Sequence, residues 1–352
     1  MFPLFLRHST IRKEVCFMSE QFVYKSVFAP YFNSFLDMKR ALGFGLLKYK
    51  WKFLEFDKFF MDAGVTEPYI TREHIAAWRK TCVNDKKKTL YDKICIMNSF
   101  CRYLCHLGCE CYISPPPRNN SDFTPYIFTH EQIEKIFKIC DGLTLHSSNM
   151  DCILFALPAL FRLLYSTGLR INEALSIKNE DISIDNHWII LKKTKNKVQR
   201  LAPINSSLCN VLKQYQEYRN KIPIKGLSTP ESHFFISTIG EPLRSGPVYK
   251  WFKKILYICE IPHIGNGSGP RVHDLRHTCA VHSLIKLIED KVDIYCALPI
   301  VAAFLGHKDT RSTEQYLRLT NEMYPDIVRM EQSVSSFVFP SKLNLENYYG
   351  NN

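Results

Sequence analysis

The sequence predicts a mainly helical protein that carries one small β-hairpin and is divided into two parts. Apolar residues recur at helical spacing through most of the chain, which indicates helices. Two β-prone runs flank a Lys/Asn turn within 187–204, and four prolines interrupt the pattern within 113–125. A chain of 352 residues is also longer than one ordinary core requires, so two domains are expected.

The first part, 20–112, is expected to be a bundle of about four helices. Thr71 is a plausible N-cap for one of them, and Gly108 is a plausible stop for the last. Three lysines between two of the helices should be exposed: Lys86, Lys87 and Lys88. Residues 1–19 are expected to be a disordered or upstream extension, with Met18 as an alternative start.

The segment 113–125 is expected to be a linker, because three successive prolines forbid a helix and favour an extended spacer. The second part, 126–335, should begin with a helix capped by Thr129 and Gln132, which match a capping box. After the hairpin, helical patterns follow at 248–260, 273–288 and 298–306, and a tail is expected at 336–352.

The charge balance points to a nucleic acid as the partner. The formal net charge is +12 and the isoelectric point is about 9.0. Between 190 and 225 there are nine Lys or Arg residues and one acid, Glu217, although a merely solvated basic face would give the same pattern. No run of 18 apolar residues occurs, so no membrane span is expected and the cytoplasm is the predicted location.

Thirteen cysteines raise the question of disulfides or metal. They lie within apolar helical patterns and no export signal is evident, so reduced thiols are favoured. One cluster could conceivably hold zinc: Cys101, Cys105, His106, Cys109 and Cys111. It lacks the paired C-x2-C spacing of structural zinc sites, so core packing is the better interpretation, and neither metal nor cofactor is expected.

Two motifs combine arginine with helix-forming residues. In "HDLRH", His273 and Arg276 are three residues apart, so both side chains leave one helix face, and His277 could share it. In "TGLRINEAL", Arg170 lies near a helix N-terminus, where backbone N–H groups and the helix dipole favour an anion. The alternative for Arg170 is a structural ion pair with Glu173.

Two further motifs place a lysine and a tyrosine. Lys195 is at the predicted hairpin tip between Lys193 and Lys197, where the alternative is a basic turn that touches phosphates without chemistry. In "LGHKDTRSTEQY", Gly306 looks like a helix stop before His307, and Tyr316 lies in the next helix, where simple packing is the alternative.

These four motifs, in this order, resemble the tyrosine recombinase (phage integrase) family. The resemblance covers 126–335 and implies that family's catalytic domain; more weakly, 20–112 resembles its SAM-like core-binding domain. The long interval between Arg276 and His307 resembles the transposase and mobile-element branch. Six residues match the family's catalytic positions: Arg170, Lys195, His273, Arg276, His307 and Tyr316.

The resemblance implies a reaction at a DNA phosphate. Tyr316 would attack it, giving a 3′-phosphotyrosine and a free 5′-hydroxyl, while Arg170 and Arg276 clamp the phosphate oxygens. Lys195 would protonate the leaving oxygen. His273 would accept the tyrosine proton or hold the phosphate, and His307 would donate a hydrogen bond. His277 would either support these residues or contact the phosphate itself.

The implied function is site-specific recombination of double-stranded DNA that integrates, excises or transposes a mobile element. The expected assembly is a dimer on one site and a tetramer in synapsis, associated with the bacterial nucleoid. Further DNA contacts are expected in the bundle at Lys86, Lys87 and Lys88 and in the hairpin at Lys193, Lys197 and Arg200. The alternatives are a catalytically silent DNA-binding relative and a nicking-resealing enzyme like a type IB topoisomerase.

Overall fold

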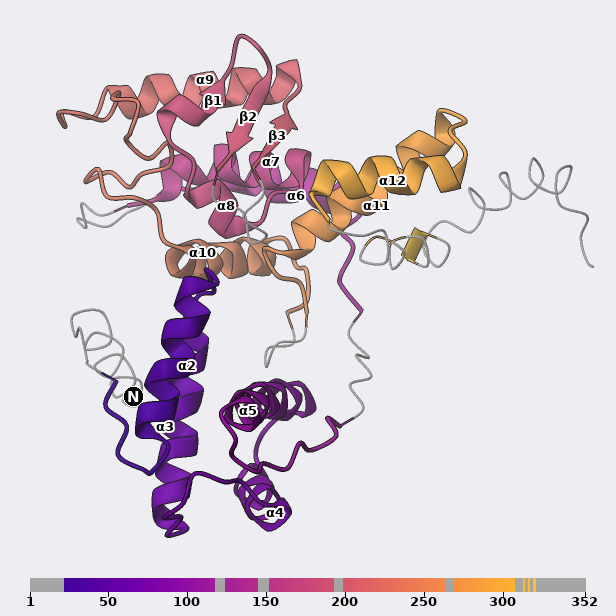
Figure 1. Ribbon diagram of the computed structural model, residues 1–352. Helices are drawn as coiled ribbons and strands as arrows, with labels where there is room; N and C mark the ends of the chain where they lie inside the picture. Colours follow the sequence, from indigo (N-terminus) through magenta and orange to yellow (C-terminus); the bar gives the residue numbers. More distant parts are fainter. Residues whose placement is uncertain are drawn as a thin grey trace, which may run out of the picture. The chain divides into compact units, whose positions relative to one another are not determined.

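A computed structural model describes residues 22–117, 124–144, 152–192, 199–263 and 269–307, together with 313, 316, 319 and 320 (Figure 1). The chain divides into two compact units between Phe123 and Thr124. The described part is mainly helical with one small antiparallel sheet, as predicted. The expected extension at 1–19, the hairpin tip at 193–198 and the tail at 336–352 lie outside the described residues.

The described part of the first unit contains a helical bundle with an aromatic core. Its helices are α2 (Ala29–Ala41), α3 (Leu47–Asp62), α4 (Arg72–Thr81) and α5 (Lys87–His106). Phe32 of α2 is central to the core, with its ring centroid 4.5 Å from that of Phe53 and 4.6 Å from that of Phe100. One phenylalanine thus joins α2, α3 and α5.

Polar groups fix the ends of the bundle's segments. Thr71 caps α4 as predicted, and its hydroxyl accepts a hydrogen bond from the backbone N–H of His74 at 3.2 Å. Asn98, buried in α5, donates to the carbonyl of Ser114 at 2.7 Å and accepts from the N–H of Ser114 at 3.1 Å. This pair holds the chain against α5 just before the first proline.

The cysteine cluster of α5 is divided between core and surface. Cys101 is fully buried, as core packing predicts, whereas Cys105 is exposed. A different group, not anticipated from the sequence, has metal-like geometry: Glu55, Cys82 and Asp85. The ammonium of Lys93 lies among them, 2.6 Å from a carboxylate oxygen of Asp85, and also contacts Glu55. An internal cation thus balances these acids.

Replacing Phe100 by alanine is expected to destabilise the first unit by about 3–5 kcal/mol, because it removes a fully buried ring at the centre of the bundle. Chemical unfolding followed by tryptophan fluorescence measures this, since Trp78 is buried in the same core. Leu107→Ala is the control, because Leu107 is an exposed residue just after α5. A loss of less than about 1 kcal/mol for the Phe100 variant would contradict this account of the core.

The second unit contains most of the helices and the sheet. In chain order its elements are α6 (His130–Asp141), η1 (Leu154–Ala156), α7 (Leu157–Thr167), α8 (Ile171–Leu175), η2 (Asn179–Asp181), β1 (Ile182–Ser183), β2 (Trp188–Leu191), β3 (Arg200–Pro203), α9 (Ser206–Asn220), α10 (Ser245–Ile258), α11 (Asp274–Glu289) and α12 (Ile294–Leu305). The strands pair antiparallel in the order β1-β2-β3. The predicted hairpin corresponds to β2 and β3, and β1 is an additional short strand.

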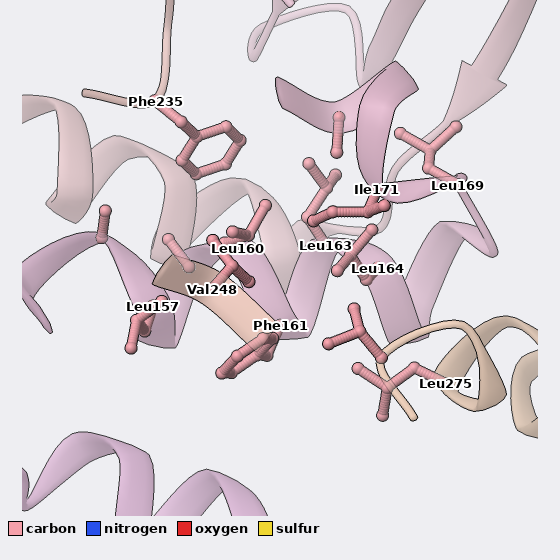
Figure 2. Close-up of a cluster of buried hydrophobic side chains, with 14 of the residues drawn as sticks. Leu157, Leu160, Phe161, Leu163, Leu164, Leu169, Ile171, Phe235, Val248 and Leu275 are labelled. Atoms are coloured by element: carbon pink, nitrogen blue, oxygen red, sulfur yellow. The ribbon is translucent and has the colours of Figure 1, made fainter. Parts of the chain in front are cut away.

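Helix α7 forms the centre of this unit because it is apolar on nearly every side. In Figure 1 it lies between the strands and α9 on one side and α10 on the other. Figure 2 shows its leucines gathered with Val248 of α10, Leu275 of α11 and Phe235. Leu169 and Ile171 belong to the same cluster, so the core fixes the chain on both sides of Arg170.

A second apolar cluster joins α11, α12 and the segment around residue 316. Its members include Leu284 of α11 and Val301 of α12, together with Tyr316 and Leu319. Helix α12 begins four residues before the predicted segment, because Asp293 caps it, and it ends at Gly306 as predicted. Within the described ranges, none of the helices combines the length and apolarity that a membrane crossing would need.

Candidate active site

Arg170 is placed by a sharp turn between α7 and α8. Gly168 ends α7 with φ of 60°, a left-handed conformation that glycine adopts without strain. A Cβ at this position would also lie 2.5 Å from Cδ2 of Leu305, so no other residue fits without rearrangement. Two residues later Arg170 is the N-cap of α8, as the sequence predicts.

The guanidinium of Arg170 is paired with Glu173, the partner that the sequence suggested. Its Nη1 lies 2.7 Å from Oε1 of Glu173, and its backbone N–H donates to Oε2 at 3.0 Å. The carboxylate is buried with 3% of its side chain exposed, whereas 25% of the Arg170 side chain is exposed. The ion pair therefore orients the guanidinium and leaves further N–H donors for an anion.

Arg276 is in the first turn of α11 and is 2% exposed. Its Nη1 donates to the carbonyl of Gly168 at 2.5 Å and its Nη2 to the carbonyl of Leu305 at 2.8 Å. Burial, and then the positive charge of Arg170, lower the pKa of Arg276 to about 10. Arg276 is still protonated at neutral pH, and two adjacent cations make the site attractive to an anion.

The two histidines at the start of α11 are uncharged at neutral pH. Loss of solvation, followed by the charges of Arg276 and Arg271, lowers the pKa of His273 to about 4, although part of its side chain remains exposed. Burial, followed by His273, lowers the pKa of the buried His277 to about 3. Their ring centroids are 4.9 Å apart. Both imidazoles can therefore accept a hydrogen bond.

Tyr316 is brought to the same place, and its side chain is 1% exposed. Its hydroxyl oxygen lies 3.0 Å from Nδ1 of His277, which can accept the phenol's hydrogen bond. The ring of His307 is nearly parallel to that of Tyr316, with centroids 6.2 Å apart. Nδ1 of His307 lies 2.8 Å from the hydroxyl oxygen of the buried Thr313.

The described structure thus brings together five of the six predicted catalytic residues: Arg170, His273, Arg276, His307 and Tyr316. The sixth, Lys195, and its neighbours Lys193 and Lys197 lie outside the described residues. His277 joins the cluster through Tyr316, a contact that spacing within "HDLRH" could not have indicated.

The predicted DNA contacts differ in their surroundings. Lys86, Lys87 and Lys88 are exposed at the start of α5, and Lys88 is 3.2 Å from a carboxylate oxygen of Asp92. Arg200, in contrast, is turned into the protein, where its Nη1 donates to the carbonyl of Phe304 at 2.6 Å. The basic composition of its segment suggested a surface contact, but this side chain is occupied within the fold.

The low pKa of His277 predicts a pH dependence of stability. In the unfolded chain His277 binds a proton below about pH 6.5, whereas in the folded chain it does so only near pH 3. The contribution of neutral His277 to the free energy of unfolding is therefore complete above pH 6.5 and is lost as the pH falls below that value. Between pH 7 and pH 5 the free energy of unfolding of His277→Asn is expected to fall by about 2 kcal/mol less than that of the unmodified protein. Urea unfolding at both pH values measures the two losses. Taking their difference cancels the contributions of His273 and His282, whose pKa values are also lowered by burial and which are present in both proteins. Equal losses would show that His277 titrates normally.

Comparison with known proteins gives one consistent result. Residues 127–323 match the family model described as the phage integrase family. A Sinorhizobium fredii protein, y4rB, with the provisional name integrase/recombinase, is 26% identical over 307 residues, covering 86% of this chain and 96% of the relative. Tyrosine recombinase XerC of Chlamydia caviae is 26% identical over 245 residues, covering 68% of this chain and 70% of the relative.

Solved structures share the fold. A XerH site-specific recombinase in a pre-cleavage complex with a difH substrate gives a TM-score of 0.58 at 19% identity, covering 83% of this chain and 79% of that one. A lambda integrase dimer, residues 75–356, bound to a COC′ core site gives 0.57 at 18% identity, covering 82% of this chain and 94% of that one. These likenesses show that the helical architecture with its small sheet is shared.

Proposed function

Because the chain belongs to the phage integrase family and is a tyrosine recombinase that acts on DNA, we propose that it cuts and rejoins strands through a 3′-phosphotyrosine intermediate formed on Tyr316. The observation that carries this proposal is the contact of the Tyr316 hydroxyl with His277, beside the paired cations Arg170 and Arg276. A phenol next to a neutral imidazole and two guanidiniums suits attack on a phosphodiester.

The step conserves the energy of the phosphodiester bond. The phenol oxygen of Tyr316 attacks phosphorus and loses its proton, the bond to the 5′-oxygen breaks, and that oxygen takes up a proton. A 5′-hydroxyl from a second strand reverses the step and releases the tyrosine. Since Tyr316 is 1% exposed in the free protein, DNA binding must bring the phenol and the phosphate together.

Arg170 and Arg276 stabilise the charge that develops on the phosphate. Each guanidinium keeps N–H donors beyond those it gives to the protein, so each can hold a non-bridging oxygen. Preorganised donors of this kind contribute about 3 kcal/mol each, or roughly a hundredfold in rate. Burial, and then the charge of Arg170, lower the pKa of Arg276, and the repulsion between the two cations would be relieved when the phosphate binds.

The histidines divide the remaining tasks. His273, partly exposed and neutral, can accept the phenol proton or hold a phosphate oxygen. His307 follows α12 and lies against the Tyr316 ring, so it can donate to the phosphate. His277 holds the phenol before DNA binds, since its buried ring lies within hydrogen-bond distance of the Tyr316 hydroxyl.

Lys195 is proposed as the general acid that protonates the 5′-oxygen. Lys195→Ala is expected to slow cleavage about a hundredfold or more. A substrate with sulfur in place of that 5′-oxygen should restore the rate, because a thiolate leaves without a proton. Lys193→Ala and Lys197→Ala serve as controls and should cleave both substrates at similar rates. If sulfur rescues one of these variants and not Lys195→Ala, the general acid is that other lysine.

A nicked DNA duplex tests the proposed function. If the strand is cut near a nick, the short 5′-hydroxyl fragment diffuses away and the protein stays attached to the 3′ end. A stable protein–DNA adduct on the element's own end sequences supports a recombinase. Binding without an adduct would favour a silent DNA-binding relative, and relaxation of supercoiled plasmids that lack those sequences would favour a topoisomerase-like enzyme.

We also propose that the protein moves a mobile element and works as a dimer on each site and a tetramer in synapsis. Support comes from the solved relatives, which include a lambda integrase tetramer bound to a Holliday junction and a Tn1549 transposon integrase in complex with a circular intermediate DNA. Deletion of 322–352 should abolish recombination and the association of subunits on DNA. Binding of a single subunit to its half of the DNA site (half-site binding) should remain. Unchanged association would show that residues 322–352 do not join the subunits.

A further inference from the structure

Arg200, at the start of β3, contacts two other segments of the site. Its side chain is 13% exposed, and it points toward α8 and the end of α12. Strand β3 follows the segment that contains Lys195, so Arg200 lies on the part of the chain that leads out of the hairpin tip. No catalytic position of the resemblance corresponds to it.

The first contact is with the C-terminal end of α12. Nη1 of Arg200 donates to the carbonyl of Phe304 at 2.6 Å, and the next carbonyl, that of Leu305, accepts from Nη2 of Arg276 at 2.8 Å. Two guanidiniums therefore cap the last turn of α12, where free carbonyls and the negative end of the helix dipole favour cations. His307 lies two residues after Leu305, so this cap fixes the position of the backbone that leads to His307.

The second contact is with Glu173 of α8. Nη2 of Arg200 lies 3.6 Å from Oε2 of Glu173, and the same oxygen accepts from the backbone N–H of Arg170 at 3.0 Å. The other oxygen of Glu173 lies 2.7 Å from Nη1 of Arg170. The carboxylate thus lies between the two arginines, and a shift of Arg200 would alter how Glu173 holds Arg170.

Gly306 leaves the space that Arg200 occupies. It has φ of 67°, and a Cβ at this position would lie 2.6 Å from Nε and 2.7 Å from Cδ of Arg200. The residue that ends α12 is therefore fitted to the arginine as well as to the turn.

This arrangement has a cost to stability. Burial lowers the pKa of Arg200, which shows that the site disfavours its charge. Among the described residues, Nη2 of Arg200 has the ion pair with Glu173 but no hydrogen-bond partner, and Nε has no hydrogen-bond partner either. Buried guanidiniums with unsatisfied donors are usually replaced well by apolar side chains when stability alone matters, so a role in function is indicated.

We propose that Arg200 is a positioning residue for strand cleavage: it holds Arg170 through Glu173 and His307 through the end of α12, and it ties both to the strand that leaves the Lys195 segment. It acts through these neighbours and does not touch the phosphate. This inference rests on the proposed function, in which those residues act on one DNA phosphate.

Arg200→Met tests it in a single-turnover assay with the nicked substrate at saturating protein. The expected result is a cleavage rate reduced about tenfold to a hundredfold with half-site affinity within about twofold of the unmodified protein, because small misplacements of catalytic groups reduce rate more than binding. Arg200→Lys should recover part of the rate, since an ammonium can still cap α12. The matched control is Arg219→Met, which removes another buried arginine, bonded to Asn179 and the carbonyl of Phe234.

The control separates positioning from general stability. Arg219→Met should lower the unfolding temperature but leave the rate unchanged at a temperature where both variants are folded. A second test uses Gly306→Ala, whose Cβ would displace Arg200. Introduced into the unmodified protein, Gly306→Ala should reduce the cleavage rate severalfold more than it does when introduced into Arg200→Ala, where the space is free.

The outcomes are distinguishable. If the unmodified protein forms a Tyr316 adduct and Arg200→Met forms it at the same rate, the positioning role is wrong and the proposed function stands. Equal slowing by Arg219→Met would also overturn the role, because any loss of packing would then be sufficient. If the unmodified protein forms no adduct, the proposed function and this inference fail together.

Discussion

Replacing Arg276 by lysine is expected to slow strand cleavage by about a hundredfold or more, with little change in DNA affinity. The guanidinium donates to the carbonyls of Gly168 and Leu305 from two different nitrogens and still has donors for a phosphate oxygen. A single ammonium cannot keep both carbonyl contacts, which are 137 residues apart in the chain, and hold the phosphate as well. The measurement is single-turnover cleavage of the nicked substrate.

Stability must be followed in parallel, because Arg276 also joins α7, α11 and α12. Arg219→Lys is a matched control, since it makes the same exchange at a buried arginine outside the site. A rate for Arg276→Lys within about threefold of the unmodified protein would contradict the phosphate-clamp role. So would an equal loss of rate in the control.

Tyr316→Phe is expected to abolish the covalent adduct, because no oxygen remains to attack phosphorus. Loss of the hydrogen bond leaves the buried His277 without this partner and should cost about 1–3 kcal/mol, so the variant should still fold and bind DNA. Denaturing gel electrophoresis of the nicked substrate with the variant measures the adduct. An adduct that persists would show that another residue is the nucleophile, and peptide mapping by mass spectrometry would identify it.

The sequence was sufficient where the signal is local. Thr71 was recognised as an N-cap because it begins a helical stretch, and Thr129 because its partner Gln132 lies three residues later. In the structure both residues form capping boxes, Thr71 with His74 and Thr129 with Gln132. Gly306 was recognised as a helix stop from the end of an apolar pattern, and it adopts the left-handed conformation. Glu173 was identified as a partner of Arg170 because i,i+3 neighbours meet on a helix.

Contacts between distant segments could not be predicted in this way. The partner of His277 is Tyr316, 39 residues away, and nothing in "HDLRH" indicates it. Arg200 belongs to a basic run that suggested the surface, but the missing side chain of Gly306, more than a hundred residues later, gives it a buried place. Strand β1 has two residues, too few for an alternating pattern to be visible.

The central claim is that Arg170 and Arg276 neutralise the charge of one phosphate while Tyr316 attacks it. A substrate in which a methyl group replaces one non-bridging oxygen of that phosphate tests the claim most directly, because this removes the negative charge that the guanidiniums hold. For Arg276→Ala and Arg170→Ala, we expect the cleavage rate relative to the unmodified protein to be much higher on this neutral substrate than on the normal one. Equal defects on both substrates would contradict it.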